Sequence, residues 1–124
     1  MYDEIYLIDD DALVNQIHTL HFSKIGVKDK LKVYTNPEDA FKELRDKKSL
    51  NMKTLILLDI NMPEMSGFEF LEAMTRDNFP HRYDVLIVTS SEAKADRDRA
   101  TEFKKYVRAF IPKPLQREHL KRYL

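Results

Sequence analysis

The sequence contains no cysteine and only two glycines among its 124 residues. Without cysteine the chain forms no disulfide, has no thiol nucleophile and cannot build a cysteine-based zinc site. Two glycines leave no room for a glycine-rich linker. No stretch approaches the roughly 18 apolar residues that a membrane-spanning helix needs, and residues 1–4 do not resemble the start of a signal peptide. We therefore expect one cytoplasmic domain over residues 1–124, with no membrane partner.

The charges balance, with 21 lysines and arginines against 21 aspartates and glutamates. Domains that bind nucleic acid usually carry a clear basic excess, so no nucleic-acid partner is expected. The balance hides an asymmetry, because residues 1–93 carry 11 basic and 17 acidic residues, whereas residues 94–124 carry 10 basic and 4 acidic residues. Solvated helix faces can produce this difference. The functional alternative is an acidic pocket built by the earlier segments and a basic docking surface near the end of the chain.

Short apolar runs alternate five times with longer amphipathic stretches. The runs cover residues 5–8, 31–34, 55–58, 85–88 and 109–111. Three of them are almost uninterrupted, as expected for strands covered on both faces of a parallel sheet. The alternation predicts right-handed crossovers and a doubly wound α/β fold.

The stretches between the runs carry helical signals. In the first stretch, Leu13, Ile17 and Leu20 follow the spacing of one helix face. Asn36 and Pro37 are typical of an N-cap and a first helical position, and they open the second helix. Three more helices are expected after Gly67, over residues 93–106 and over residues 116–124.

Polar residues follow four of the five runs. They are Asp9-Asp10-Asp11, Asp59, Thr89-Ser90 and Pro112-Lys113-Pro114. Ligands of open parallel sheets bind outside the carboxyl ends of the strands, so these residues are expected to meet in one crevice. Any one of the acids is most simply a turn former or a helix N-cap. Their convergence at one edge favours a functional site.

The chemistry of these side chains is complementary. Three neighbouring carboxylates, Asp9, Asp10 and Asp59, repel one another, and a hard divalent cation such as Mg²⁺ removes that conflict. Lys113 adds a positive charge, and Thr89 adds a hydroxyl that can donate to a phosphoryl oxygen. The set suits phosphoryl transfer, in which a carboxylate can serve as the nucleophile.

With these motifs the sequence resembles the receiver domain of two-component response regulators. The matching motifs are Asp9-Asp10, Asp59-Ile60-Asn61-Met62-Pro63 with Gly67-Phe68, Thr89-Ser90 and Lys113-Pro114. The resemblance covers essentially the whole chain. The resemblance implies a flavodoxin-like fold with five parallel strands in the order 2-1-3-4-5. It also implies a phosphoacceptor module that is not a true enzyme.

The resemblance assigns roles to individual residues. It implies that Asp59 is the phosphoacceptor and that Mg²⁺, or another divalent cation such as Mn²⁺, is bound by Asp9, Asp10, Asp59 and the backbone carbonyl of Asn61. Lys113 would pair first with Asp59 and then with the phosphoryl group, and the Lys113–Pro114 bond would be cis. The donor would be a sensor histidine kinase or a histidine phosphotransfer protein.

The resemblance also implies an output surface. Thr89 and Phe110 would form a switch pair that changes the surface of the last two helices and the last strand, for a downstream protein or for self-association. Phe110 is equally consistent with an ordinary core residue. Because the chain ends at the last expected helix, no separate output domain is expected. Pro112 lacks an N–H and leaves the length of the last strand open.

Two other functions compete with a receiver module. A phosphatase that uses an aspartyl-phosphate would need a second acid two residues after the nucleophile as general acid or base, and Asn61 occupies that position. A scaffold that binds its partners constitutively would not need such a cluster of charges. His18 and His21 lie three residues apart, and we interpret them as part of a partly exposed helix surface rather than as a metal site.

Overall fold

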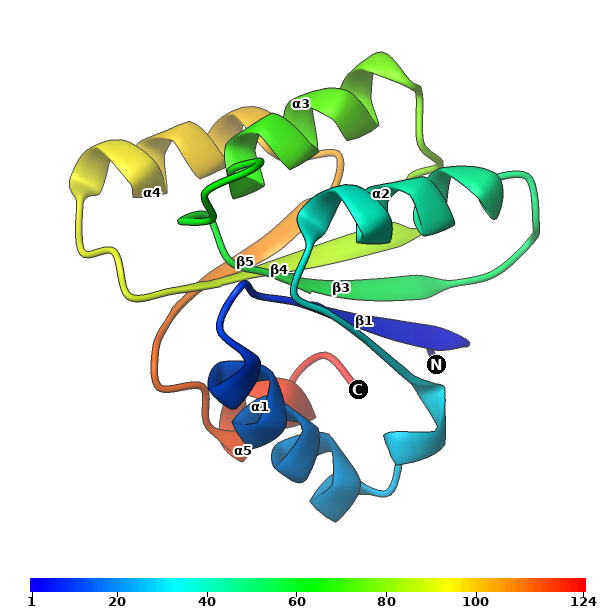
Figure 1. The fold of residues 1–124 in the computed structure, drawn as a ribbon, viewed down its shortest axis with the longest axis vertical. Coiled ribbons are helices and arrows are strands. Elements are labelled where there is room, and N and C mark those ends of the chain that lie inside the picture. The colour runs from blue at the N-terminus through cyan, green and yellow to red at the C-terminus, as the bar shows by residue number, and fades with distance from the viewer.

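The computed structural model describes residues 1–124 and contains a parallel sheet of five strands between helices on both faces (Figure 1). The strands are β1 (Glu4–Ile8), β2 (Leu31–Tyr34), β3 (Thr54–Leu58), β4 (Tyr83–Thr89) and β5 (Val107–Pro112). The helices are α1 (Ala12–Ile25), α2 (Pro37–Asp46), α3 (Gly67–Arg76), α4 (Lys94–Ala100) and α5 (Arg117–Lys121), with short 3₁₀ turns at Lys28–Lys30 and Thr101–Phe103. The strand order is β2-β1-β3-β4-β5, which confirms the predicted fold. None of the helices has the length and apolar character that crossing a membrane requires.

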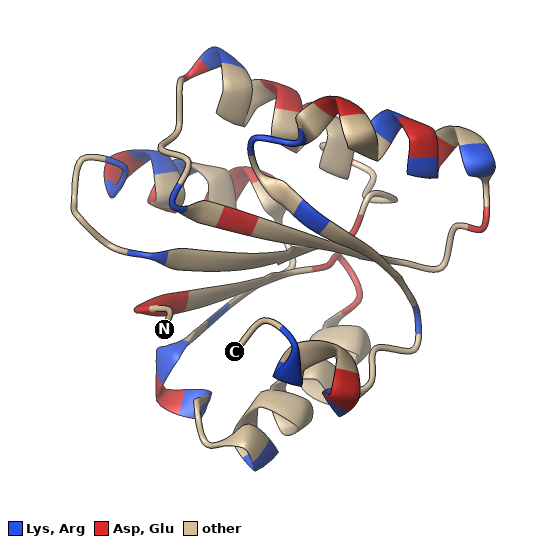
Figure 2. Cartoon of the chain, turned by 180° about the vertical axis from the view of Figure 1, so that it is seen from behind, with Lys and Arg blue, Asp and Glu red and all other residues tan.

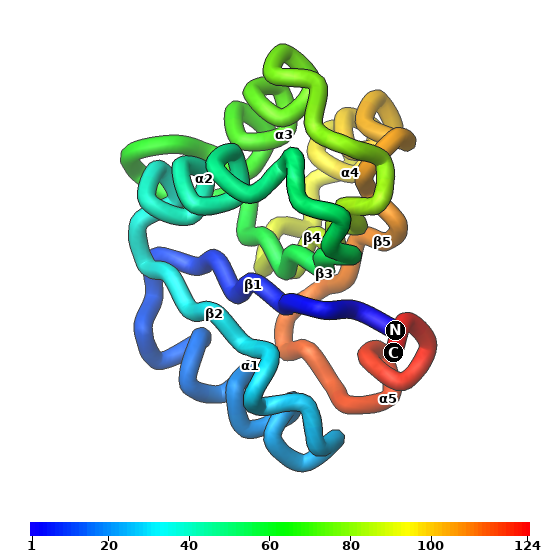
Figure 3. The backbone as a smooth tube through the Cα atoms, turned by 90° about the vertical axis from the view of Figure 1, so that its right-hand side faces the viewer, coloured from blue at the N-terminus to red at the C-terminus, as the bar shows by residue number.

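The sheet separates two hydrophobic cores. Helices α2, α3 and α4 cover one face, and α1 and α5 cover the other (Figures 1 and 3). Side chains of a strand point alternately to opposite faces, so Tyr6 and Ile8 enter the core under α2–α4 while Ile5 and Leu7 enter the core over α1 and α5. Because both faces are covered, β3 is buried along its whole length and is apolar from Leu55 to Leu58.

Helix ends are fixed by local hydrogen bonds that the sequence indicates. The Asp11 carboxylate accepts from the Leu13 N–H at 2.9 Å, and the Asn36 side chain accepts from the Glu38 N–H at 2.9 Å. Both are N-caps that satisfy backbone donors of a first helical turn. Helix α1 ends at Gly26, whose φ of 91° lies in the left-handed region that glycine adopts without a steric penalty.

Strand β5 runs to Pro112, which pairs with Thr89 at the end of the ladder with β4. The missing N–H of Pro112 costs little because β5 is an edge strand and Pro112 is its last residue. The next N–H, that of Lys113, donates to the Thr89 carbonyl at 2.8 Å. The open question of the strand's length is thus resolved in favour of a full strand.

Helix α4 is shorter than the expected span of residues 93–106. It ends at Ala100, and a 3₁₀ turn leads from there toward β5. Tyr106 already belongs to the sheet edge, since its carbonyl accepts from the Val85 N–H at 2.9 Å and its buried hydroxyl donates to the Phe79 carbonyl at 2.7 Å. The chain must therefore leave the helix before residue 106.

Helix α1 turns its apolar stripe toward solvent. The exposed fractions of the three stripe residues are 61% for Leu13, 45% for Ile17 and 61% for Leu20. The residues that α1 buries are Asn15, His18 and Phe22. The predicted helix is confirmed, but the face that an apolar stripe normally buries is here the outer one.

The interpretation of His18 as partly exposed is wrong. Only 5% of His18 is exposed, and burial lowers its pKa to about 4, which keeps the imidazole neutral at physiological pH. His21 is half-buried, as expected.

Candidate functional site

Three carboxylates meet where β1 and β3 end. The two strands are adjacent and parallel, so the residues that follow Ile8 and Leu58 emerge side by side. The Asp59 N–H donates to the Ile8 carbonyl at 3.1 Å and extends the ladder by one step. Carboxylate oxygens of Asp9, Asp10 and Asp59 all lie within 4.8 Å of one another. The structure therefore brings together the three acids that the sequence selects.

Lys113 reaches this cluster from the end of β5. Its ammonium donates to Asp9 Oδ2 at 2.8 Å and lies 3.6 Å from Asp59 Oδ2. The other Asp9 oxygen accepts from the Asp11 N–H at 2.9 Å. In this structure the hydrogen bond of Lys113 goes to Asp9, and its contact with Asp59 is a longer ion pair.

The electrostatics of the cluster are unbalanced. Burial raises the pKa of Asp59, and the negative charge of Asp9 raises it further. The positive charge of Lys113 and a 3.3 Å hydrogen bond from the Asn61 N–H act in the opposite direction and lower it. Burial alone would lower the pKa of Lys113, but its hydrogen bond to Asp9 and the charges of both buried acids raise it on balance. Lys113 therefore stays charged, and it contacts two of the three carboxylates, Asp9 and Asp59. A hard divalent cation fits this donor set, because Mg²⁺ prefers carboxylate oxygens.

The ends of β4 and β5 supply the remaining polar groups. Thr89 is fully buried, and its Oγ1 accepts from the Ser91 N–H at 3.1 Å. The Lys113–Pro114 peptide bond is cis, as the family resemblance implies. Since Lys113 N–H is bonded to the Thr89 carbonyl, the two strand ends are fixed next to each other.

Gly67 allows the loop after Asp59 to fold back over the strand end. Its N–H donates to the Ile60 carbonyl at 3.1 Å. A Cβ atom at position 67 would lie 2.6 Å from the Asp59 carbonyl oxygen and 2.7 Å from Ile60 Cα. Both are backbone atoms that cannot move aside without displacing Asp59. Only glycine, which has no Cβ, allows position 67 to lie this close to the backbone of Asp59 and Ile60.

Asn15 is a residue of the site that sequence reasoning missed. Its buried amide donates to the Asp9 carbonyl at 2.9 Å and to the Tyr34 carbonyl at 3.1 Å, so it ties the loop that carries the acids to β2. Its side-chain oxygen has no hydrogen-bond partner. The helical pattern gave no signal for it, because the apolar stripe indicates the opposite face of α1.

Phe110 lies on the same face of the sheet as Thr89. In the ladder Phe110 pairs with Ile87, two residues before Thr89, so the two side chains are diagonal neighbours on the face under α4. Phe110 is half-buried, packs against the larger core and lies under the Arg97 guanidinium at 5.0 Å from its ring centre. This aromatic side chain therefore lies between Thr89 and the outer surface of α4.

A 2-1-3-4-5 parallel sheet with acids, a hydroxyl and an ammonium at its carboxyl edge defines a flavodoxin-like phosphoacceptor domain. The family model for the response regulator receiver domain matches residues 5–124, and the chain belongs to this family. It is a signalling module rather than a catalytic enzyme.

Similar proteins agree with this assignment. The chain is 28% identical to Chemotaxis protein CheY1 of Helicobacter pylori (strain J99) over 122 residues, which cover 98% of this chain and 93% of that protein. It is 25% identical to Probable methanogenesis regulatory protein FilR2 of Methanothrix harundinacea over 120 residues, which cover 95% of this chain and 76% of that protein.

Solved structures support the fold. A two component response regulator from Cytophaga hutchinsonii superposes with a TM-score of 0.81 at 24% identity and covers 98% of this chain and 92% of its own. A response regulator receiver domain protein from Methanospirillum hungatei gives a TM-score of 0.76 at 22% identity over 97% of this chain and 89% of its own.

Proposed function

We propose that Asp59 is the phosphoacceptor and that it takes its phosphoryl group from a phosphohistidine of a sensor histidine kinase or a histidine phosphotransfer protein. The observation that carries this assignment is the position of Asp59: it is buried, within 4.8 Å of Asp9 and Asp10, and 3.6 Å from the Lys113 ammonium. The proposal treats residues 1–124 as one receiver domain acting in the cytoplasm.

The metal ligands are proposed to be the side chains of Asp10 and Asp59, the backbone carbonyl of Asn61, and Asp9 through water. When bound, Mg²⁺, or Mn²⁺ in its place, neutralises the carboxylates and the phosphoryl oxygens. The excess of acids over the single ammonium supports this assignment, because without a cation the buried acids repel one another.

The transfer itself is a displacement at phosphorus. A carboxylate oxygen of Asp59 forms the new P–O bond while the P–N bond of the donor breaks, and the electron pair of that bond stays on the imidazole. The Lys113 ammonium, already 3.6 Å from Asp59, is suited to neutralise the incoming charge. The Thr89 hydroxyl donates to a phosphoryl oxygen after Thr89 shifts toward it.

The output is proposed to pass from Thr89 to Phe110 and on to the surface of α4, β5 and α5. Phosphorylation adds about two negative charges beside Lys113 and draws Thr89 toward them. Phe110, its diagonal neighbour, then fills the vacated space and leaves its stack with Arg97. This movement changes a groove of about 240 Å³ between α4 and β5.

The chemistry of that groove favours an acidic downstream protein. Arg97 and Lys104 line it together with Phe110, and no acid does. Arg108 also lines it, but Asp84 and two backbone carbonyls already bind its guanidinium. The basic excess that the sequence shows after residue 93 is thus partly available for a partner.

Phosphorylation from acetyl phosphate tests the assignment. We expect labelling of the parent by intact mass in the presence of Mg²⁺, none in excess chelator, and none for Asp59→Asn. The matched control is Asp39→Asn, an exposed acid in the first turn of α2, which should label like the parent. Equal labelling of Asp59→Asn and Asp39→Asn would contradict the assignment.

A further inference from the structure

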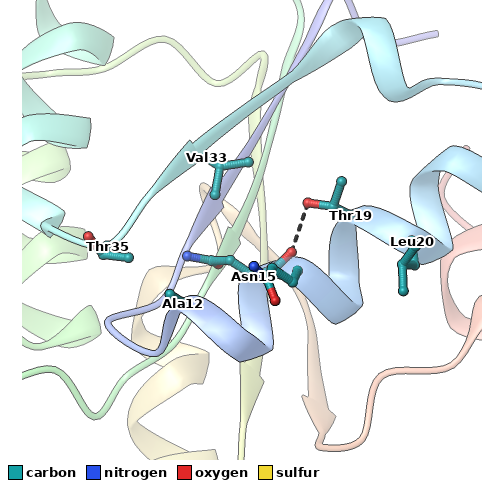
Figure 4. A pocket seen from close by; sticks show the side chains of 7 residues that line it. Ala12, Asn15, Thr19, Leu20, Val33 and Thr35 are labelled. Atoms are coloured by element: carbon teal, nitrogen blue, oxygen red, sulfur yellow. Dashed lines mark hydrogen bonds between the residues drawn. The ribbon is translucent and has the colours of Figure 1, made fainter.

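Asn15 is the one side chain of α1 that bonds to the loop carrying the acids. Only 2% of Asn15 is exposed, and it lies in the first turn of the helix, where α1 faces β2 (Figure 4). Its side-chain amide donates to the Asp9 carbonyl at 2.9 Å and to the Tyr34 carbonyl at 3.1 Å. Carbonyls only accept, so neither a hydroxyl, with its single donor, nor a carboxylate could make both bonds.

The Asp9 carbonyl belongs to the peptide group that joins Asp9 to Asp10. A peptide group is planar and rigid, so a hydrogen bond to its oxygen fixes the orientation of the unit that connects the two acids. The Asp10 carboxylate is exposed and makes no hydrogen bond or ion pair within the chain. The direction in which it leaves the backbone therefore depends on this peptide, and Asn15 holds the peptide in place.

The bonds around this peptide form a small network. The Asp9 N–H donates to the Tyr34 carbonyl at 3.2 Å, the same oxygen that Asn15 binds. Asp9 Oδ1 accepts from the Asp11 N–H at 2.9 Å, and Asp9 Oδ2 accepts from the Lys113 ammonium at 2.8 Å. Asn15 is the only member of the network that belongs to α1, so it couples the helix and the edge strand β2 to the acids.

No charged residue of α1 could hold the loop instead. Between Ala12 and Ile25 the helix contains no acid, and its only lysine or arginine is Lys24 in the last turn, at the opposite end from the acids (Figure 2). The side chain of His18, the other polar residue that α1 buries, makes no hydrogen bond within the chain. The attachment of α1 to the loop therefore depends on one neutral amide.

The buried position of Asn15 has a cost in stability. Its Oδ1 is buried without a hydrogen-bond partner, and an unpaired buried oxygen is unfavourable. An apolar side chain of similar size would remove this unpaired oxygen but would leave the Asp9 carbonyl without its amide donor. The Tyr34 carbonyl would keep the Asp9 N–H. Because the two effects oppose each other, Asn15 contributes little to the free energy of unfolding, and its main effect is on the position of the acids.

We propose that Asn15 is a positioning residue of the phosphoryl-transfer site, which orients the Asp9–Asp10 peptide for the binding of a divalent cation. Groups that orient metal ligands from outside the coordination sphere typically change the metal affinity by roughly 10- to 100-fold when they are removed. The inference rests on the proposed function, because it takes Asp10 and Asp59 as metal ligands. Asn15 itself acts only through the backbone of Asp9.

A Mg²⁺ titration of the unphosphorylated protein, followed through the NMR signals of backbone amides, provides the first test. Asn15→Leu keeps the approximate size of the side chain and removes both donors, so it should raise the Mg²⁺ dissociation constant about tenfold. Its urea midpoint should stay close to that of the parent. The matched control is Thr19→Val, because the Thr19 hydroxyl donates to the Asn15 carbonyl at 2.8 Å but does not contact Asp9 (Figure 4). Thr19→Val should bind Mg²⁺ like the parent.

Hydrogen exchange in metal-free buffer tests the orientation of the loop without any ligand. The Asp9 N–H donates to the Tyr34 carbonyl, and the Asp11 N–H donates to Asp9 Oδ1. Both amides should exchange several-fold faster in Asn15→Leu than in the parent, whereas the amides of β3 should be unchanged, because only the loop opens. Thr19→Val should exchange like the parent at all of these positions.

Mg²⁺ binding by Asn15→Leu that is as tight as binding by Thr19→Val would overturn the inference, and so would unchanged exchange at Asp9 and Asp11. Asp10→Asn separates the inference from the proposed function. If the Mg²⁺ affinity depends on Asp10 but not on Asn15, only the inference is refuted. If the affinity does not depend on Asp10, the proposed metal ligands are refuted, and exchange alone then decides whether Asn15 orients the loop.

Discussion

The two ends of the sheet differ in how their acidic side chains are paired with basic ones. At the amino ends of the strands acids and bases are matched: Glu4 accepts from Lys47 at 3.1 Å and lies 3.6 Å from Lys32. Asp84, at the start of β4, accepts from the Arg108 guanidinium at 2.8 Å. At the carboxyl ends three carboxylates lie within 4.8 Å of one another, and the one ammonium nearby, that of Lys113, contacts two of them.

The difference shows which end the chain uses for stability and which for chemistry. The acids of these pairs are mostly buried and already have a basic partner, so they need no further ligand, and breaking such a pair lowers the free energy of unfolding. The buried acids Asp9 and Asp59 raise the energy of the resting protein, and a bound cation would relieve that repulsion. Removal of an acid should therefore lower stability but leave phosphorylation intact at the amino end, and should raise the stability of metal-free protein but abolish phosphorylation at Asp59.

The largest effect on stability is expected for Gly67→Ala. The new methyl group would lie 2.6 Å from the Asp59 carbonyl oxygen, so the backbone that carries the acid has to move. We expect the free energy of unfolding to fall by about 3 kcal/mol and the labelling rate from acetyl phosphate to fall with it. Urea denaturation and labelling on the same samples measure both.

Gly26→Ala is the control for Gly67→Ala. Its φ of 91° makes alanine unfavourable, but nothing lies within 4 Å of the added Cβ. It should cost about 1 kcal/mol and leave labelling unchanged. Unaltered labelling in Gly67→Ala would show that the loop position does not matter to Asp59.

At the amino end, Asp84→Asn should cost about 2 kcal/mol of unfolding free energy. The carboxylate accepts from the Tyr2 hydroxyl at 2.6 Å and from Arg108, and the amide cannot accept on both sides. Labelling by acetyl phosphate should stay within twofold of the parent, because Asp84 is at the opposite end of β4 from Thr89. A loss of labelling as large as that of Gly67→Ala would contradict the proposal that the amino end of the sheet serves stability and the carboxyl end serves chemistry.

Much of this architecture could be predicted from the sequence, for a physical reason. Strands covered on both faces must be apolar throughout, so runs such as residues 55–58 and 85–88 stand out. Their order along the chain then fixes which polar residues follow the strands. Asp9, Asp59, Thr89 and Lys113 could be selected without coordinates because parallel strands end at a common edge.

The sequence could not predict features that depend on register or on hydrogen bonds across the fold. The stripe of Leu13, Ile17 and Leu20 predicts a helix correctly, yet α1 buries Asn15 and His18. A burial pattern based on hydrophobicity fails here because the amide of Asn15 satisfies a loop carbonyl, that of Asp9, and a strand carbonyl, that of Tyr34. The preference of Lys113 for Asp9 over Asp59 is a matter of side-chain distances that no spacing encodes.

A third prediction concerns alkaline pH and the amino end. Burial, together with the hydrogen bond to Asp84, raises the pKa of Tyr2 above the ordinary value of 10.0. The unfolded chain therefore loses this proton at lower pH than the folded protein. The resulting stability is present below pH 10 and is lost as the pH rises above it, with a slope of up to about 1.4 kcal/mol per pH unit.

Tyr2→Phe should remove this slope. Urea denaturation of the parent and of Tyr2→Phe at a series of pH values from 8 to 11 measures it. The difference between the two proteins should be constant below pH 10 and shrink above it. A constant difference over the whole range would mean that Tyr2 ionises equally in both states.

The smallest expected effect has the opposite sign and tests the comparison most directly. In metal-free buffer at neutral pH, Asp59→Asn should raise the free energy of unfolding by about 1 kcal/mol. The pKa of Asp59 is raised by burial, so folding disfavours its ionised form, and the neutral amide removes that cost. Lys113 keeps its 2.8 Å hydrogen bond to Asp9 and is not left without a partner. The gain should shrink as the pH falls through the folded-state pKa and vanish below the ordinary value of 3.8, where the carboxyl is neutral in both states.

Saturating Mg²⁺ should reverse the order of the two proteins, because the parent gains stability by mass action and Asp59→Asn lacks one of the proposed ligands. Asp84→Asn makes the same chemical change at the other end of the sheet and should lose stability in both buffers, since its carboxylate is already paired. Thermal and urea denaturation of the three proteins, with and without Mg²⁺, give the full comparison. Equal destabilisation of the metal-free protein by both substitutions would show that the acids at the carboxyl end do not raise the energy of the resting protein. The two ends of the sheet would then not differ in the way proposed, with one end serving stability and the other serving chemistry.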